Sequence, residues 1–198
     1  KSDVNVIIEG QDDITFTGKI EINIGQNVTI KNVKFVHSAE DKHDFIANVG
    51  SPTGKNYNTT LLVEGCSFAG NGKQNTVAVR TIHPTSVTIK ECEASGLHSF
   101  LQNTGGQTVA VEGVTITNSK GGLAIGSPNG AVSVKNCDLT TATYGVRLDA
   151  NNATAPGATL ENNEIEAYIP VSVRKATSNN YKVSFEGTEN NYDASNGD

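Results

Sequence analysis

The sequence contains no tryptophan and no methionine, and aromatic residues make up only 6% of its 198 positions. It also lacks any stretch with the apolar period of an amphipathic helix. Instead, Val, Ile and Thr alternate with polar residues, which is the pattern of a strand with one buried face. Glycine is plentiful, at 20 residues. The composition therefore argues against a helical protein and favours many short strands with turns between them.

Further absences restrict the function. No apolar run approaches the roughly 18 residues of a membrane-spanning helix, so no membrane span is expected. The net charge of −6 argues against a nucleic-acid partner, because phosphate binding requires a basic face. The chain shows neither an initiator methionine nor a signal peptide, which favours a processed protein or an excised segment. With 36% hydrophobic residues, it can still form one domain with a core.

One eight-residue phrase recurs along the chain. Its copies read "VIIEGQDD", "VTIKNVKF", "LLVEGCSF", "VTIKECEA", "VAVEGVTI", "VSVKNCDL", "ATLENNEI" and "VSFEGTEN". They start at positions 6, 28, 61, 87, 109, 132, 158 and 183. A repeat of roughly 20 to 50 residues is typical of a solenoid, in which each copy builds one turn.

Each copy predicts a strand, a corner and a second strand. Positions one and three are apolar and share one face of a strand, as with Val28 and Ile30. Position five is glycine or asparagine in most copies, and these residues readily adopt a left-handed turn conformation. Position eight is mostly apolar again, as in Phe35 and Phe68. A third short strand is expected at 45–49, 77–80, 123–125, 145–148 and 170–174.

Three strands and three corners make one coil of a parallel β-helix. We therefore expect one all-β domain over residues 1–198, with about eight coils and a length of roughly 40 Å at the spacing of adjacent strands. The phrase, with Asn or Gly at its corner, and the stretch "YGVRLDANNATAPGATLENNEI" resemble the right-handed, single-stranded parallel β-helix (pectate-lyase-like or pectin-lyase-like) superfamily. The resemblance covers nearly the whole chain. It implies that a polysaccharide would lie along the sheet of third strands.

Position four of the phrase is charged in every copy. The residues are Glu9, Lys31, Glu64, Lys90, Glu112, Lys135, Glu161 and Glu186. The first seven alternate in sign, and stacked neighbours of opposite sign attract. We interpret this column as a structural ladder on a solvated face, with ~0–1 kcal/mol for each exposed pair. The binding site is therefore expected elsewhere.

Position six holds all three cysteines. Cys66, Cys92 and Cys137 share an inward column with Val33 and Val114, and a free cysteine behaves as a small buried hydrophobe. Free buried thiols are expected, with a Cys66–Cys92 disulfide between adjacent coils as the alternative. The odd number of cysteines argues against a disulfide framework. No histidine shares the column, which argues against metal ligation there.

All three arginines of the chain fall on predicted third strands. They are Arg80, Arg147 and Arg174. The alternation predicts that their side chains point outward and that Arg147, Asp149 and Arg174 lie close together. Guanidinium groups suit carboxylate or sulfate, so this face is a candidate site for an acidic glycan, with Tyr144 and Tyr168 as stacking partners. The alternative is that the arginines are ordinary exposed strand residues paired with Asp149.

The patterns of known enzymes of this fold are missing. The resemblance would imply clustered aspartates with N-T-D, D-D, G-H-G and R-x-K patterns for hydrolases, or several calcium-binding carboxylates and an arginine base for lyases. The single aspartate pair, in "QDD" at 11–13, is expected on the second strand of the first coil, away from the arginines. Paired-carboxylate hydrolysis needs two acids within roughly 5–10 Å, and only loops could supply the second.

The longest insertion spans residues 36–60. It carries His37, Glu40, Asp41, His43 and Asp44, together with Tyr57, which could stack on a sugar. Two histidines without a fixed spacing are a weak metal pattern, so a solvated loop is expected, with no metal and no cofactor. His83 and His98 are interpreted as structural.

The predicted function is a secreted or cell-surface bacterial module that binds polysaccharide without cleaving it, as in adhesion or glycan recognition. One alternative is a polysaccharide lyase or glycoside hydrolase acting on an acidic glycan. Another is a structural segment of an adhesin or phage tail fibre, with a host or cell-surface protein as its partner. Neither terminus shows a capping helix, so we expect either a longer surface protein or another chain to cover the ends.

Overall fold

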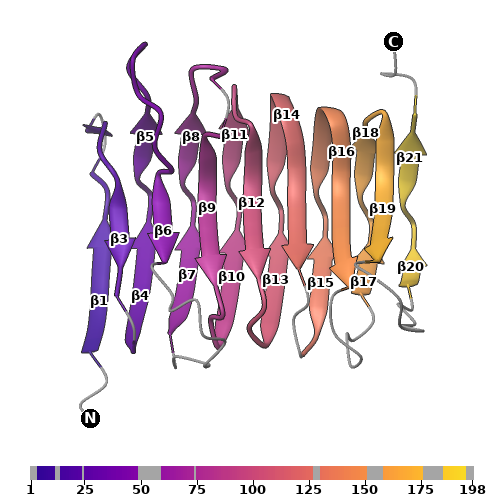
Figure 1. Ribbon diagram of the computed structural model, residues 1–198, viewed down its shortest axis with the longest axis horizontal. Coiled ribbons are helices and arrows are strands. Elements are labelled where there is room, and N and C mark those ends of the chain that lie inside the picture. Colours follow the sequence, from indigo (N-terminus) through magenta and orange to yellow (C-terminus); the bar gives the residue numbers. More distant parts are fainter. Residues whose placement is uncertain are drawn as a thin grey trace.

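The protein is an all-β parallel solenoid. The computed structural model describes residues 4–11, 14–23, 25–48, 59–73, 75–126, 130–150, 158–175 and 185–194. Within these residues the chain forms strands and no helix, and the strands follow one another along the long axis in sequence order (Figure 1). The predicted β-solenoid is therefore confirmed. In the same residues no helix is long and apolar enough to cross a membrane.

The phrase strands form one parallel sheet of eight strands. They are β1 (Val4–Glu9), β4 (Gln26–Lys31), β7 (Thr60–Glu64), β10 (Ser86–Lys90), β13 (Thr108–Glu112), β15 (Val132–Lys135), β17 (Ala158–Glu161) and β20 (Phe185–Thr188). Val28 pairs with Val6 on one side and Leu61 on the other, so equal phrase positions stand side by side. This register follows from the alternation, because a shift of one residue would turn the apolar face to solvent.

The remaining strands form the other two faces. The second face holds β2 (Thr15–Phe16), β5 (Lys34–Val36), β8 (Ser67–Ala69), β11 (Glu93–Ser95), β18 (Glu164–Glu166) and β21 (Asn191–Asp193). The third face holds β3 (Ile20–Ile22), β6 (Ile46–Asn48), β9 (Val77–Ile82), β12 (Ser99–Thr104) and β19 (Ile169–Lys175). Two long strands, β14 (Thr115–Gly126) and β16 (Asp138–Ala150), run through both faces.

Two third strands were not predicted from the sequence. They are β3, with sequence "IEI", and β12, with sequence "SFLQNT". Both pair in register with third strands that were predicted: Ile20 with Ile46, and Leu101 with Val79 and Leu123. Their place among the third strands is defined by this tertiary pairing.

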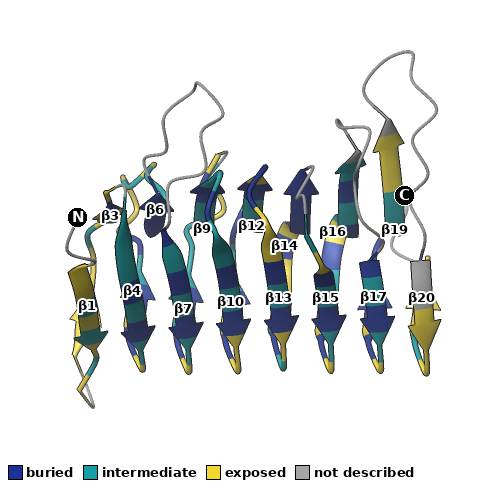
Figure 2. Cartoon of the chain, turned by 90° about the horizontal axis from the view of Figure 1, so that it is seen from below, coloured by how far each residue is buried: buried dark blue, intermediate teal, exposed yellow. Residues whose placement is uncertain are grey.

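The solenoid has about six enclosed turns rather than eight equivalent coils. The end strand β1 is largely exposed, as are the described residues Gly187 and Thr188 of β20, while strands between them such as β4 and β7 alternate buried and half-exposed residues (Figure 2). Several large apolar side chains are exposed near the two ends: Val4, Ile7, Ile14, Phe16, Tyr168, Ile169, Val173 and Tyr192. The first and last repeats therefore act as end strands with only one neighbour each.

The corner after the phrase strand has the expected left-handed backbone. Positive φ angles occur at Asn32 (54°), Gly65 (62°), Gly113 (64°) and Asn136 (53°). Glu91 takes the same conformation (φ 50°) although its side chain disfavours it. The fold therefore imposes the corner on this repeat against the local preference of its residue.

The last repeat is shifted by two residues from its predicted register. Leu160 pairs with Gly187 and Glu161 with Thr188, so Phe185 rather than Val183 stands in register with the first phrase position, Ala158. Its corner is Glu189, with φ 57°. The prediction that Glu186 is the eighth ladder residue was wrong. Alternation repeats every two residues, so it does not distinguish two strand registers that differ by two residues.

The first repeat also departs from its phrase. Its second strand begins at Thr15, and Phe16 pairs with Phe35. Of the "QDD" residues predicted on this strand, Gln11 lies before it, and residues 12 and 13 lie outside the described part of the chain.

Phenylalanines stack along the axis inside the solenoid. Phe35 and Phe68 are parallel, with ring centroids 4.9 Å apart. Phe68 meets Phe100 edge-on at 5.8 Å, and Phe16 meets Phe35 edge-on at 5.5 Å. This stack joins neighbouring coils, with Phe16, Phe35 and Phe68 in register on the second face and Phe100 reaching it from β12.

The three cysteines are buried and free, as predicted. No Cys66–Cys92 disulfide forms. The hydrogen bond with Cys66 and the burial of the thiol both raise the pKa of Cys92, and burial raises the pKa of Cys137 to about 11. Asn163 continues the same column: its amide accepts from the Cys137 N–H (3.0 Å) and donates to the Val134 carbonyl (2.9 Å). The column is structural.

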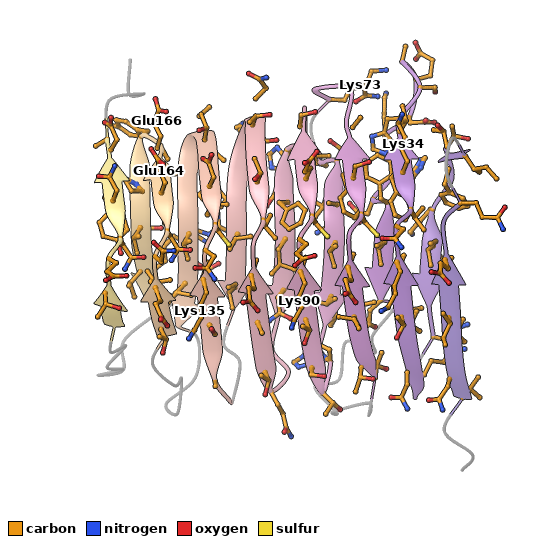
Figure 3. All side chains as sticks on the ribbon, turned by 180° about the vertical axis from the view of Figure 1, so that it is seen from behind. Lys34, Lys73, Lys90, Lys135, Glu164 and Glu166 are labelled. Atoms are coloured by element: carbon orange, nitrogen blue, oxygen red, sulfur yellow. The ribbon has the colours of Figure 1, made fainter. Side chains whose placement is uncertain are left out.

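The charge ladder forms over its first seven positions. Glu9, Lys31, Glu64, Lys90, Glu112, Lys135 and Glu161 stand in register. Ion pairs join Lys31 to Glu64 (2.9 Å), Lys90 to Glu112 (3.8 Å) and Lys135 to Glu161 (2.5 Å). The Glu64 carboxylate raises the pKa of Lys31, and the Glu161 carboxylate raises that of Lys135. Figure 3 labels Lys90 and Lys135 on this sheet.

Candidate functional site

The third face carries the arginines, but they do not form one row. Arg80 stands in register with Ala47 and Gln102, and Arg147 with Ala124 and Ser172. These residues belong to one row across β6, β9, β12, β14, β16 and β19. Arg174 lies two residues further along β19, opposite Asp149 in the next row. The row splits because the register of β19 places Ser172, rather than Arg174, beside Arg147.

Arg80 is held by two neighbours. Its Nε and Nη2 atoms donate to the two carboxylate oxygens of Asp44 (2.5 and 3.2 Å), and Nη1 donates to Gln102 Oε1 (2.5 Å). Asp44 comes from the segment that precedes β6, and its side chain is largely buried. A forked pair of this kind fixes the guanidinium plane and leaves part of its outer edge on the third face.

Arg147 and Arg174 share Asp149. Arg147 Nε lies 3.3 Å from one carboxylate oxygen, and Arg174 Nε lies 2.7 Å from the other. The structure thus brings together the three residues that the sequence placed side by side. Two guanidinium groups on one carboxylate leave an excess of positive charge. Arg174 is the more exposed of the two, with 64% of its side chain accessible.

Tyr144 lies beneath Arg147. The guanidinium carbon of Arg147 is 4.6 Å from the centroid of the Tyr144 ring, a cation–π contact. The ring extends over Gly121, where an added Cβ would come within 2.5 Å of it, and its hydroxyl donates to Ser99 Oγ at 3.2 Å. Glycine is required at 121 for this reason. Tyr144 therefore links β16 to β12 and supports Arg147. Because its ring already contacts Arg147 and Gly121, little of the ring is left to stack on a sugar.

Tyr168 lies in the turn before β19 and is 60% exposed. Among the described residues, no ring or ion contact joins it to the arginines. Tyr57, the other stacking candidate, lies outside the described residues. The site residues predicted from the sequence thus fall into a contacting group (Tyr144, Arg147, Asp149 and Arg174), with Arg80 and Tyr168 on either side.

The charges of three cations act on His98. Burial lowers its pKa most, and the charges of Lys120, Arg80 and Arg147 lower it further. Its Nδ1 atom is buried and has no hydrogen-bond partner among the described residues. The imidazole is therefore neutral at pH 7, and the positive charge of the cluster stays on Lys120 and the two arginines.

Sequence reasoning missed His98, Lys120, Gln102 and Asp44. His98 was interpreted as structural, Asp44 was assigned to the solvated loop of the 36–60 insertion, and Gln102 and Lys120 lay on segments assigned no role. Aligning β12 with β14 was the missing step: His98 comes immediately before β12, and the Lys120 N–H of β14 donates to the carbonyl of the preceding residue, Leu97. That alignment depends on β12, which the sequence did not reveal.

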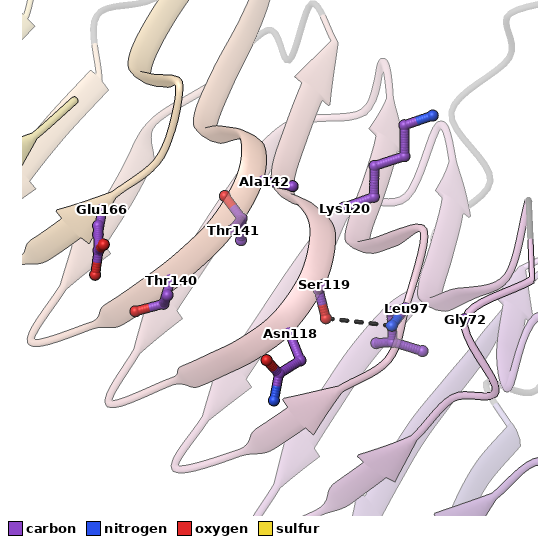
Figure 4. A pocket seen from close by; sticks show the side chains of 9 residues that line it. All are labelled: Gly72, Leu97, Asn118, Ser119, Lys120, Thr140, Thr141, Ala142 and Glu166. Carbon is purple, nitrogen blue, oxygen red and sulfur yellow. Dashed lines mark hydrogen bonds between the residues drawn. The ribbon is translucent and has the colours of Figure 1, made fainter. Parts of the chain in front are cut away.

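A hollow of about 670 Å³ adjoins this cluster where β14 and β16 pass from the second face to the third (Figure 4). It is lined by Gly72, Leu97, Asn118, Ser119, Lys120, Thr140, Thr141, Ala142 and Glu166. The pairing of β14 with β16 shifts on both sides of Ser119, and Asn118 has a left-handed φ of 49°. Such bulges re-aim side chains and are frequent beside binding sites.

The 36–60 insertion builds no metal site in its described part. Among the described residues, no group of three or more His, Cys, Asp or Glu side chains is placed to hold a metal. His37 is buried and stacks on Phe45 at 3.8 Å, and His43 meets His37 edge-on at 4.8 Å. Burial lowers the pKa of His37 most, and the neighbouring His43 lowers it further. These histidines pack the base of the loop that carries Asp44.

Comparison with family models, with curated proteins and with solved structures finds no match to this chain. The site must therefore be interpreted from its own chemistry. It offers a cationic edge of arginine and lysine, two carboxylates that orient the arginines, and an adjoining polar hollow. This arrangement suits an anionic ligand that also carries hydroxyl groups.

Proposed function

We propose that this chain is a non-catalytic module of a secreted or cell-surface protein that binds an acidic polysaccharide on its third face. The observation that carries the proposal is the set of arginines on this face: Arg80 and Arg147 stand in one row across β9, β12, β14 and β16, and Arg147 and Arg174 share Asp149 at 3.3 and 2.7 Å. A chain of net charge −6 would otherwise repel a polyanion, so a local excess of cations on one face is informative. Assignment to the right-handed, pectate-lyase-like superfamily is part of this proposal.

The geometry favours binding over cleavage. In the described residues, the carboxylate in contact with Arg147 is Asp149, and it also pairs with Arg174. Paired-carboxylate hydrolysis needs a second acid within roughly 5–10 Å and positioned across the bond. The ordered arginine pairs resemble a recognition surface, because they hold the guanidinium planes ready for carboxylate or sulfate groups.

The test is a glycan array that includes uronic-acid and sulfated polymers, followed by titration of the best ligand. Replacing Arg80, Arg147 and Arg174 together by Gln is expected to weaken binding by about tenfold or more, because charge-assisted hydrogen bonds are lost. The matched control replaces Lys31, Lys90 and Lys135 by Gln, which removes three charges from the first sheet. Circular dichroism and thermal melting confirm that both variants fold.

An equal loss of glycan affinity in the arginine and lysine variants would indicate long-range charge attraction rather than a binding site. It would contradict the proposal. Unsaturated products absorbing in the ultraviolet would identify a lyase instead. If no glycan binds the wild-type chain, the proposal fails.

A second candidate, a structural segment of an adhesin or fibre, is favoured by the ends of the solenoid. Ile7 is 72% exposed at one end, and Val173 (46%) and Tyr192 (48%) are exposed near the other. Unpaired strands with apolar side chains invite another strand to add to them. Self-association that persists in the arginine variant and disappears when Ile7 and Tyr192 are replaced by Lys would support this function.

A further inference from the structure

The 36–60 insertion begins with two histidines whose rings are in contact. His37 is 7% exposed and stacks on Phe45, and the ring of His43 meets it edge-on, with the centroids 4.8 Å apart. Both ring nitrogens of His37 and the Nε2 atom of His43 are buried, and none of them has a hydrogen-bond partner among the described residues. This packing suits two neutral imidazoles, because a buried charge without a partner is costly.

The two acidic residues that act on His37 have partners of their own. The Asp41 carboxylate accepts the Ser38 N–H at 2.6 Å, and the Asp44 carboxylate accepts two hydrogen bonds from Arg80 on β9. Burial lowers the pKa of His37 most, although the charges of Asp41 and Asp44 raise it. A proton bound here therefore gains no hydrogen bond from either carboxylate within the described part of the chain.

The start of the insertion is fixed to the neighbouring coil. Asn71 donates to two carbonyls of the turn over 38–41 at 2.8 Å each, and Lys73 pairs with Glu40 at 3.3 Å. The residues that follow this turn are held by the ring contacts of the two histidines and by the ion pair of Asp44. Any displacement of the histidines is therefore expected on the Asp44 side of the turn.

Asp44 couples the histidine pair to the third face. It follows His43 directly in the sequence, so an outward movement of the His43 ring carries its carboxylate away from Arg80. Arg80 would keep its hydrogen bond to Gln102 Oε1 at 2.5 Å, but its charge would no longer be neutralised. The third face would thereby gain an available guanidinium group without any change in its strands.

We propose that protonation of the His37–His43 pair in mild acid moves His43 into solvent, releases Asp44 from Arg80 and strengthens the binding of anionic polymers to the third face. This inference rests on the proposed function and adds control by pH to it. The direction follows from the packing: His43 is half-buried and can reach water, where a charged imidazole recovers its hydration.

The first test observes the arginine side chains directly, without a ligand. The chain has three arginines, so their Nε–H groups give three signals in a nitrogen-15 NMR spectrum. Between about pH 7.5 and pH 5.5, where histidines titrate, the Arg80 signal is expected to shift and its proton to exchange faster with water. Arg147 and Arg174, which both pair with Asp149, are internal references whose signals should change little.

The midpoint of this change identifies the titrating group. It should lie below about pH 6.5, the ordinary histidine value, because burial lowers the pKa of His37. A midpoint near about pH 4, where carboxyl groups titrate, would overturn the proposal.

Three variants separate the histidine pair from other effects. Asp44→Asn should give at neutral pH the Arg80 signal that the wild type gives in acid. The double variant His37→Phe/His43→Phe keeps aromatic rings in contact and should remove the pH response. His98→Gln is the matched control: the charge of Arg80 also acts on His98, but this residue lies outside the insertion, so the response should remain. Thermal melting confirms that each variant folds.

The consequence for binding is measured with heparin, whose sulfate groups keep their charge over this range. The affinity of the wild type is expected to rise by about three- to tenfold between about pH 7.5 and pH 5.5, the effect of one added ion contact. Arg80→Gln retains every histidine and should lose this rise. A rise that persists in Arg80→Gln would reflect the general gain of positive charge in acid and would contradict the proposal.

Failure of the pH control and failure of the proposed function give different results. If the Arg80 signal does not respond to pH, or responds equally in the double phenylalanine variant, the pH control is wrong and the function of the third face is unaffected. If Arg80 is released in acid but neither heparin nor a uronic-acid polymer binds at either pH, the release is supported and the proposed function is wrong.

Discussion

At the scale of single residues, three histidines have buried ring nitrogens without a hydrogen-bond partner among the described residues: His37, His43 and His98. His37 is 7% exposed, and neither of its ring nitrogens has a hydrogen-bond partner among the described residues. Its ring packs on Phe45, so the neutral form is favoured in the folded protein. A buried neutral imidazole must gain a proton in acid, and this opposes folding.

His37 therefore makes stability depend on pH in a defined window. Because its folded pKa lies below the unfolded value of about 6.5, its stabilisation is complete above that pH. The stabilisation declines as the pH falls below about 6.5, since the unfolded chain binds the proton first. His37→Phe keeps the ring stack and should reduce the loss of unfolding free energy between about pH 7 and pH 5. Urea titrations at both pH values measure this, and an unchanged loss would show that His37 is not responsible.

At the scale of the element, the charge ladder shows how a repeated phrase sets strand order. Lys90 stands between Glu64 and Glu112, with attractive neighbours on both sides. Each exposed pair contributes little, but seven alternating positions penalise any strand that pairs with the wrong neighbour. The ladder therefore favours the native order of strands more than it adds stability.

Lys90→Glu places three carboxylates in succession and is expected to lower the unfolding free energy by about 1 kcal/mol. Lys90→Gln should cost less, and the difference between the two should shrink in high salt because exposed charges are screened. Lys34→Glu is the matched control, since its in-register neighbours are the uncharged Thr15 and Ser67. Denaturant titrations at low and high salt measure the effect. Equal costs at positions 34 and 90 would contradict the ladder.

At the scale of the whole molecule, distance from the ends decides how much a core residue contributes. Each coil touches only its neighbours, so stability in a solenoid is the sum of local terms and nearest-neighbour contacts. Phe68 is 2% exposed and contacts Phe35, Phe45 and Phe100, whereas Phe16 is 37% exposed at the first coil. Residues that stand in register along the axis thus contribute differently to stability.

Phe68→Ala is expected to lower the unfolding free energy by about 3–5 kcal/mol, the usual cost of a buried phenylalanine. Phe16→Ala should cost about 1–2 kcal/mol, because much of its ring already faces solvent. Hydrogen exchange should show the matching gradient, with the slowest amides in β7, β10 and β13. Similar costs at both positions would indicate that the ends are covered as well as the centre.

The sequence by itself determined the features that arise within one strand. Alternation placed Val28, Ile30 and the cysteines inside, and the corner residues marked where each strand turns, because these depend only on the two-residue period and on local backbone preference. The sequence also predicted the contact of Arg147, Asp149 and Arg174, because the third strands that carry them belong to adjacent coils. Tertiary structure alone decided which residues from different coils lie at the same level. It shifted the last repeat by two residues, revealed β12, and placed Lys120 against the segment of Leu97 and His98, because corners of variable length set that level and carry no periodic signal.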